Sequence, residues 1–143
     1  MELIDTLKNL LNGHSTESHI IVESMGYFKE RNLETIAKIL VDKLQLEKII
    51  ITLGPDGMAM LDTKGNGQLQ IIPTAANEVF DVSGAGDTAI AAITASLLAG
   101  ATLEEAAWVG NCAAGVVVKK RGTALCSKEE LSEYFQNLRK LIK

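Results

Sequence analysis

Apolar residues recur along this chain at two spacings, one typical of helices and the other of buried strands. From Leu33 to about Leu46 they fall every three or four positions, which predicts an amphipathic helix that Asn32 can cap. The next apolar positions are consecutive, within residues 48–53, which is typical of a strand buried on both faces. This strand is the obvious surface for the apolar stripe of the helix to cover.

A second apolar region is divided by a run of turn residues. Two short apolar stretches flank Lys64-Gly65-Asn66-Gly67, and Pro73 follows the second stretch. This arrangement predicts a β-hairpin. We therefore expect an α/β chain with helices packed on a sheet. The expected strands lie near residues 48–53, 58–62, 68–72 and 78–82.

The C-terminal part of the chain has a helical pattern throughout. An Ala-rich stretch from about Ala85 to Ala99 predicts a slim helix that Gly100 ends. The capping box Thr102-Leu103-Glu104-Glu105 opens a second helix, which is expected to run to about Lys120. Ser127-x-x-Glu130 opens a third. Three consecutive helices therefore follow the strands.

The first 28 residues give the weakest pattern and are poorly assigned. Four leucines between residues 3 and 11 have helical spacing, and residues 13–16 read as a loop. The stretch His19-Ile20-Ile21-Val22 is compatible with a short strand. His14 and His19 lack a convincing partner, so we expect both in loops or at the surface.

Composition narrows the range of partners. The 143 residues carry a formal net charge of -4 and are 47% hydrophobic, which fits a single domain spanning residues 1–143. The largest basic cluster is Lys119-Lys120-Arg121, so neither nucleic acid nor an anionic membrane is expected as the main partner. No apolar run approaches the roughly 20 residues that span a bilayer, and no signal peptide is evident. Cys112 and Cys126 lack the spacing of a zinc site or a disulfide framework, so we expect a cytoplasmic protein.

The stretch Asp81-Val82-Ser83-Gly84-Ala85-Gly86-Asp87-Thr88 joins an extended run to the Ala-rich helix. Two glycines at such a junction let the backbone turn sharply, and the first amides of the helix then lack partners. With the helix dipole behind them, these amides favour a phosphate or another negative charge. Asp87 is then either a base beside that phosphate or an ordinary acidic residue in the first turn of a helix.

Gly84-x-Gly86-x-x-Ala89 also matches the dinucleotide-binding fingerprint, and Glu104 or Glu105 lies about twenty residues further on. That fingerprint requires its helix to lead into a second parallel strand. Here Gly100 is followed by the capping box of another helix. The context therefore argues against a dinucleotide site.

Other candidate positions are ambiguous from pattern alone. The turn Gly54-Pro55-Asp56-Gly57, which follows the buried strand, reads as an ordinary connection. Trp108 is expected to pack in or beside the core. Asn111 lies between Trp108 and a run of small apolar residues. Its amide either forms internal hydrogen bonds or contacts a ligand.

The stretch Asp81-Val82-Ser83-Gly84-Ala85-Gly86-Asp87 resembles the D-T/V-T/S-G-A-G-D signature of the ribokinase-like (PfkB) carbohydrate kinases. Further matches follow in order over residues 30–135 and look most like the kinase domain of bifunctional heptose-7-phosphate kinase/heptose-1-phosphate adenylyltransferases. They include Ile72-Pro73-Thr74, Glu78-Val79-Phe80, Glu104-Glu105-Ala106-Ala107, Asn111-x-Ala113-Ala114-Gly115 and Gly122-Thr123. An ordered set of matches is more specific than one glycine loop.

The resemblance implies ATP-dependent phosphoryl transfer to a hydroxyl of a sugar or sugar phosphate, such as heptose 7-phosphate. Asp87 would be the base that takes the proton from the acceptor hydroxyl. Gly84, Ala85 and Gly86 would direct their amides at the charge that develops on the transferred γ-phosphoryl group. These roles agree with the chemistry, because phosphoryl transfer depends mainly on positioning and charge stabilisation.

The resemblance also implies where the nucleotide binds. Thr52, Gly54 and Gly57 match the turn on the nucleotide side, and Asn111 matches a helix residue beside the adenosine. ATP is expected to act with Mg²⁺.

Asp81 and Ser83 match positions near a loop that binds a monovalent cation in relatives, so K⁺ is a further expected ligand. Relatives also carry an N-terminal half with the sugar-binding residues and a small β lid, and they use an Asn-x-x-Glu motif near the phosphates. Neither feature has a counterpart in these 143 residues. The resemblance therefore implies the C-terminal half of a three-layer ribokinase-like fold, with the missing half or a second copy as its partner.

Two functions follow from this reading. The first is the nucleotide-binding and catalytic-base half of a sugar kinase, which has little activity alone because positioning of the acceptor accounts for much of the rate. The alternative is a catalytically inactive nucleotide-binding or assembly module derived from such a kinase. In that case exposed apolar surface is expected to drive self-association.

Overall fold

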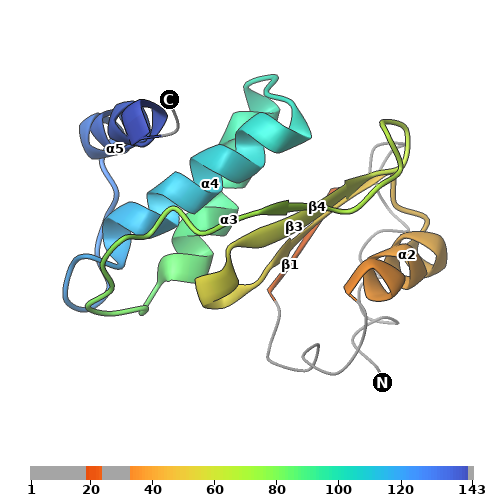
Figure 1. Ribbon diagram of the computed structural model, residues 1–143, viewed down its shortest axis with the longest axis horizontal. Coiled ribbons are helices and arrows are strands. Elements are labelled where there is room, and N and C mark those ends of the chain that lie inside the picture. The colour runs from red at the N-terminus through yellow and green to blue at the C-terminus, as the bar shows by residue number, and fades with distance from the viewer. Residues whose placement is uncertain (1–18, 24–32, 142–143) are drawn as a thin grey trace.

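Four strands form one mixed sheet in the order β1-β2-β3-β4 (Figure 1). β1 pairs in parallel with β2, and the remaining neighbours are antiparallel. The computed structural model describes residues 19–23 and 33–141. The strands are β1 (His19–Glu23), β2 (Lys48–Thr52), β3 (Met58–Asp62) and β4 (Gln70–Ile72). The helices are α2 (Leu33–Leu44), the short 3-10 helix η1 (Gly54–Asp56), α3 (Ala85–Leu98), α4 (Leu103–Val117) and α5 (Lys128–Leu141).

The sheet lies between two helical layers. Side chains of a strand alternate between its faces, so Ile49 and Ile51 of β2 pack with α2, whereas Ile50 packs with α3 and α4. All three isoleucines are almost completely buried, which explains why the strand is apolar at consecutive positions. Figure 1 shows α2 on one side of the sheet and α3 and α4 on the other. The expected three-layer α/β arrangement is confirmed.

Two hydrophobic cores result, one on each face of the sheet. The α2-side core consists of Ala37, Val41, Leu44, Leu46, Ile49, Ile51, Ala59 and Leu61. The α3/α4-side core consists of Ile50, Met58, Met60, Ile72, Ala89, Ile93, Leu103, Ala106 and Ala107. β2 and β3 therefore contribute to both cores. Trp108 of α4 is half-buried and packs against the α3/α4-side core.

Capping boxes begin α4 and α5 where the sequence predicts them. Glu105 N–H donates to Thr102 Oγ1 (3.2 Å), and Thr102 N–H donates to Glu105 Oε2 (2.8 Å). The same exchange joins Glu130 N–H to Ser127 Oγ (3.2 Å) and Ser127 N–H to Glu130 Oε2 (2.9 Å). Each box satisfies N–H groups that the start of a helix leaves without a partner. α4 ends at Val117, somewhat earlier than expected.

The expectation of a strand at residues 78–82 is wrong. The N–H groups of Phe80 and Asp81 both donate to Val118 O, at 2.7 and 3.2 Å. The segment therefore lies against the C-terminal end of α4 and does not join the sheet. Phe80 is 68% exposed, and Val79 and Val82 are also exposed. The apolar residues of this segment therefore lie on the surface.

The stretch His19–Val22, which the sequence left compatible with a short strand, lies in β1 (His19–Glu23), so His19 is in a strand and not in a loop. The expected hairpin is formed by β3 and β4. The helical spacing between residues 3 and 11, the loop at residues 13–16 and the cap Asn32 lie outside the described residues. Of the helices within residues 33–141, none has both the length and the apolar character needed to cross a membrane.

Candidate functional site

A cleft of about 420 Å³ opens where four segments of the chain meet. The segments are the turn after β2, the connection from β4 to α3, the first turns of α3, and α4 with the residue that follows it. The cleft brings together these predicted site residues: Thr52, Gly54, Gly57, Ala85, Gly86 and Asn111. The remaining predicted residues belong to the glycine loop (residues 81–87) but do not line the cleft: Asp81, Ser83, Gly84 and Asp87.

The turn after β2 forms one wall of the cleft. Leu53 N–H donates to Gly57 O (2.8 Å), and Gly57 N–H donates to Gly54 O (3.2 Å), which closes the turn. Gly57 has φ +95°, where other residues are strained, and a Cβ there would lie 2.1 Å from Ile72 O. Glycine therefore lets the turn pack against the end of β4. Thr52 is buried beside the turn at the end of β2.

The glycine loop leads into α3 through Gly84, which is the N-cap in the left-handed conformation (φ +76°), and no side chain caps the helix there. Ala85 N–H donates to Val82 O (3.1 Å), so this amide is engaged within the loop. Within the described part of the chain, no acceptor is found for the N–H groups of Gly86 and Asp87. They lie at the positive end of the helix dipole. The N–H groups available to an anion are therefore those of Gly86 and Asp87, and not that of Ala85.

Asp87 is the third residue of α3, and its side chain is exposed. It directly follows Gly86, which lines the cleft. This position suits both roles that the sequence leaves open, because a carboxylate in the first turn favours the helix and is also close to the anion-binding amides. Its role as a base stays a prediction.

Asp81 makes a long-range contact that sequence reasoning missed. Its Oδ1 accepts a hydrogen bond from Ser83 N–H, and its Oδ2 accepts one from Gly122 N–H, both at 2.9 Å. Hydrogen bonds from the Ser83 side chain and from these two backbone N–H groups lower the pKa of Asp81. The carboxylate thereby joins the glycine loop to the loop after α4. Because both oxygens have these partners, K⁺ at Asp81 and Ser83 stays a prediction.

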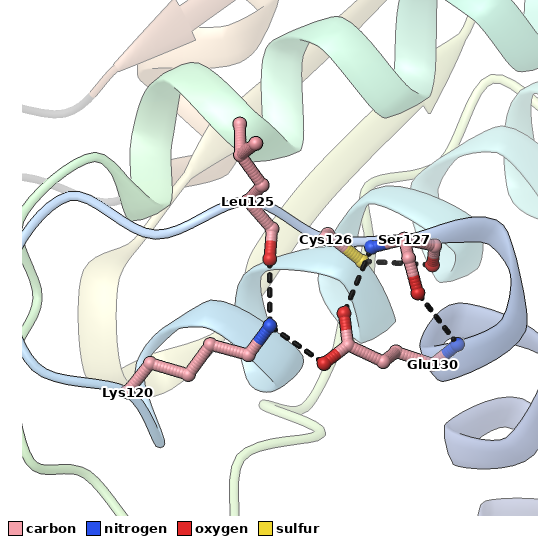
Figure 2. Close-up of polar contacts among 5 residues, drawn as sticks. All are labelled: Lys120, Leu125, Cys126, Ser127 and Glu130. Carbon is pink, nitrogen blue, oxygen red and sulfur yellow. Dashed lines mark hydrogen bonds and ion pairs between the residues drawn. The ribbon is translucent and has the colours of Figure 1, made fainter.

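The loop after α4 is closed by an ion pair (Figure 2). Lys120 Nζ donates to Leu125 O (2.7 Å) and lies 2.6 Å from Glu130 Oε1. The other carboxylate oxygen of Glu130 accepts the N–H of Ser127 in the capping box of α5. The hydrogen bond from Lys120, followed by that from Ser127 N–H, lowers the pKa of Glu130 to about 2. The loop that carries Gly122 is therefore tied to the start of α5.

Asn111 of α4 lines the cleft and is only 4% exposed. Its Oδ1 accepts from Ala75 N–H (3.1 Å), and its Nδ2 donates to Pro73 O (2.7 Å). These bonds hold residues 73–76, which we call the strap, and two residues of the strap line the cleft. Internal hydrogen bonding by Asn111 is therefore observed, and its contact with adenosine stays a prediction.

The chemistry of the cleft suits an organic ligand. Most of its lining is apolar side chains and backbone, with a few polar groups, as is typical of small-molecule sites. Within residues 19–23 and 33–141, no group of three or more His, Cys, Asp or Glu side chains could hold a metal ion. Cys112 and Cys126 are free, and burial raises the pKa of Cys112 to about 11, which disfavours its reactive thiolate form.

Comparison with known sequences adds the family context. The profile of the pfkB family carbohydrate kinases matches residues 10–130. The bifunctional protein HldE of Paramagnetospirillum magneticum is 47% identical over 95 residues, which cover 66% of this chain and 19% of that protein. The protein of the same name from Shewanella sp. (strain ANA-3) is 45% identical over 125 residues, which cover 87% of this chain and 25% of that protein. The chain thus spans about a fifth to a quarter of the length of these curated relatives.

Solved structures share the fold at lower sequence identity. Ribokinase from Thermotoga maritima superposes with a TM-score of 0.71 at 23% identity, over 83% of this chain and 42% of the other. Phosphofructokinase-2 from Escherichia coli in complex with potassium gives a TM-score of 0.73 at 22% identity, over 94% of this chain and 45% of the other. The described architecture is therefore ribokinase-like.

Proposed function

The chain belongs to the pfkB family of carbohydrate kinases, and we propose that its cleft binds ATP for transfer of the γ-phosphoryl group to a hydroxyl of a sugar or sugar phosphate. The residue matches with heptose-7-phosphate kinases make heptose 7-phosphate the first acceptor to test. ATP as the donor fits the cytoplasmic location expected from the sequence.

The observation that supports this proposal most is the position, beside the cleft, of two amides for which the described residues provide no acceptor. The N–H groups of Gly86 and Asp87 lie in the first turn of α3, and Gly86 itself lines the cleft. The turn from Gly54 to Gly57 forms another wall. An apolar cavity next to a helix start suits a nucleotide, because the base needs apolar contact and the phosphates need N–H donors and the positive helix dipole.

The proposed roles follow from these positions. The amides of Gly86 and Asp87 bind and orient the terminal phosphate, and they stabilise the charge that develops on it. The Asp87 carboxylate accepts the proton of the attacking hydroxyl. A bond then forms between the sugar oxygen and the γ-phosphorus while the bond from that phosphorus to the β,γ-bridging oxygen breaks, and ADP leaves.

Metal ions enter the proposal only with the nucleotide. Mg²⁺ would accompany the ATP phosphates and neutralise part of their charge. K⁺ near Asp81 and Ser83 is a separate prediction, and none of the roles above depends on it.

The described site is proposed to be one part of a larger active site. The chain aligns with 42% and 45% of the two kinase structures above. We propose that the acceptor-binding residues come from a region of the family that the matched part of this chain does not include. The 143-residue chain alone is then expected to transfer phosphate slowly, because orientation of the acceptor contributes much of the rate.

A phosphorylation assay tests this proposal. The chain is incubated with ATP, Mg²⁺ and heptose 7-phosphate, with and without a polypeptide carrying the N-terminal kinase half of a relative. We expect ADP formation to rise strongly with the added half and to fall about 100-fold or more in Asp87→Asn. Rapid turnover by the chain alone would refute the proposal that its site is only one part of a larger active site. No turnover in either mixture would refute the kinase assignment for this chain.

Calorimetry separates binding from chemistry. Gly86→Val places a bulky side chain at the helix start that lines the cleft, so binding of adenylyl imidodiphosphate should be lost. Asp87→Asn keeps the backbone amides, so its affinity should stay within about threefold of the original. Equal losses of affinity in both variants would contradict the proposal that the Asp87 carboxylate acts in the chemical step and not in nucleotide binding.

A second candidate function rests on the exposed apolar residues of segment 78–82. Val79, Phe80 and Val82 are all more than half exposed. Such surface favours association with another chain. A stable dimer in sedimentation velocity, together with no nucleotide binding in calorimetry, would favour the assembly module over the kinase half.

A further inference from the structure

Ala75, in the middle of the strap, is held by side chains from two helices. Its N–H donates to Asn111 Oδ1 of α4 at 3.1 Å, and its carbonyl accepts from Tyr134 Oη of α5 at 2.6 Å. Ala75 is 2% exposed, so both backbone groups need partners inside the protein. Residues 111 and 134 lie far from the strap in sequence, and together they fix both polar groups of one residue.

The position of the strap determines the shape of the cleft. Thr74 and Ala76, on either side of Ala75, both line the cleft. The turn after β2 packs tightly against the strap. A Cβ on Gly57 would lie only 2.7 Å from both Pro73 C and Thr74 N. The strap is thus confined between the turn and the two helices. A change in either support would move two cleft-lining residues.

Tyr134 reaches the strap because α4 has a glycine at the crossing point. A Cβ on Gly115 would lie 2.8 Å from Tyr134 Oη, so any side chain there would displace the hydroxyl. The ring is half-buried, and Lys119 Nζ lies 4.9 Å from its centroid. Burial raises the pKa of Tyr134, which keeps the hydroxyl protonated and able to donate. Figure 1 shows α5 beside α4 and away from the sheet.

We propose that Tyr134 is a positioning residue for nucleotide binding, which fixes the strap through Ala75 O and so sets the width of the cleft. None of the α5 residues whose side chains the structure describes lines the cleft, so Tyr134 would act on the bound nucleotide indirectly, through the strap. The inference rests on the proposed function, because it assigns Tyr134 to the same ATP site. A purely structural Tyr134 would attach α5 to α4 and leave the affinity of the cleft unchanged.

Titration calorimetry with adenylyl imidodiphosphate and Mg²⁺, well below the melting temperature, distinguishes these two roles. Tyr134→Phe keeps the ring and removes the hydroxyl, and we expect its Kd to rise about fivefold, as loss of one ordering hydrogen bond implies. Ser96→Ala is the matched control. Its hydroxyl also donates to a backbone carbonyl, Ala92 O at 2.8 Å, but Ser96 does not line the cleft, so its Kd should not change.

The outcomes separate the inference from the function on which it rests. If the unaltered chain binds the analogue and Tyr134→Phe binds equally well, the positioning role is overturned and the nucleotide site stands. If the unaltered chain does not bind, both are overturned.

Amide hydrogen exchange gives a readout that needs no nucleotide. The Ala75 amide should exchange several-fold faster in Tyr134→Phe than in Ser96→Ala, because the strap opens more often when its carbonyl loses its partner. An unchanged exchange rate would show that the hydroxyl does not hold the strap.

Discussion

Gly57 occupies a position where the backbone conformation and the packing both exclude a side chain. Its φ is +95°, and the nearest atom to a Cβ there would be Ile72 O. That atom belongs to the sheet backbone and cannot move aside as the end of a flexible side chain would. The wall of the cleft after β2 therefore requires glycine at position 57, because even the methyl group of alanine would not fit.

Gly57→Ala should lower the free energy of unfolding by about 3 kcal/mol or more, since it adds overpacking to backbone strain. Gly54→Ala is the control in the same turn, because Gly54 also has positive φ (+60°) but no atom within 4 Å of its Cβ position. It should cost only about 1–2 kcal/mol from strain. Urea denaturation of both variants measures the difference, and equal losses would show that the contact with β4 is unimportant.

Single residues also show where sequence reasoning stops. The glycine loop carries a local signal, so its residues could be named from the pattern, whereas the turn after β2 reads locally as an ordinary connection and could be named only through the family resemblance. Tyr134 and Gly122 could not, because their partners Ala75 and Asp81 lie 59 and 41 positions away and nothing in the local pattern marks the contacts. Asn111 was noticed as a polar residue in an apolar helix. Its partners on the strap depend on how α4 crosses the sheet.

At the scale of elements, the carboxylate of Glu130 connects the loop after α4 with α5. It pairs with Lys120 after α4 and accepts the N–H of Ser127 at the start of α5. Its pKa is lowered from 4.5 to about 2, so this group stabilises the fold when ionised. The stabilisation is fully present above about pH 4.5 and is lost as the pH falls toward 2.

Glu130→Gln should therefore lower the melting temperature at pH 7, and the difference from the unaltered chain should shrink between pH 4.5 and 2. Glu34→Gln is the control, because Glu34 forms an exposed ion pair with Lys38 within α2. We expect a smaller loss at pH 7 there, since such pairs contribute little. Melting curves by circular dichroism over this pH range give the comparison. A difference in melting temperature that grows as the pH falls would contradict the stabilising role of the ionised Glu130 carboxylate.

Elements with their own start signals were predictable, and those that need a distant partner were not. The capping boxes at Thr102 and Ser127 locate α4 and α5, and the turn at residues 64–67 locates the hairpin. Residues 78–82 have the apolar character of a strand, but a strand also requires a neighbour in the sheet. The N–H groups of Phe80 and Asp81 donate to Val118 O instead, and the local sequence does not indicate which partner a segment will find.

At the scale of the whole molecule, the two hydrophobic cores share β2 and β3. Ile51 belongs to the α2-side core and Ile50 to the α3/α4-side core, one position apart on the same strand. Loss of packing on one face therefore weakens a strand that the other face also needs. The described part of the chain should unfold as a single cooperative unit.

Ile50→Ala and Ile51→Ala should each lower the free energy of unfolding by about 2–5 kcal/mol, because both side chains are fully buried. Each variant should still show one calorimetric transition whose measured enthalpy equals its van't Hoff enthalpy. Ile39→Ala is the control. Ile39 of α2 is 43% exposed, so this substitution should lower the free energy of unfolding much less. Two separated transitions in either core variant would show that the layers unfold independently.

The packing of Trp108 against the α3/α4-side core has a practical consequence for spectroscopy. It is the sole tryptophan of the chain, and it packs against the α3/α4-side core without lining the cleft. Its emission spectrum should shift to longer wavelength when that core is exposed to water and should hardly respond to an occupied cleft. Intrinsic fluorescence should therefore report unfolding of this protein, and a ligand titration followed by fluorescence would need a fluorophore attached elsewhere.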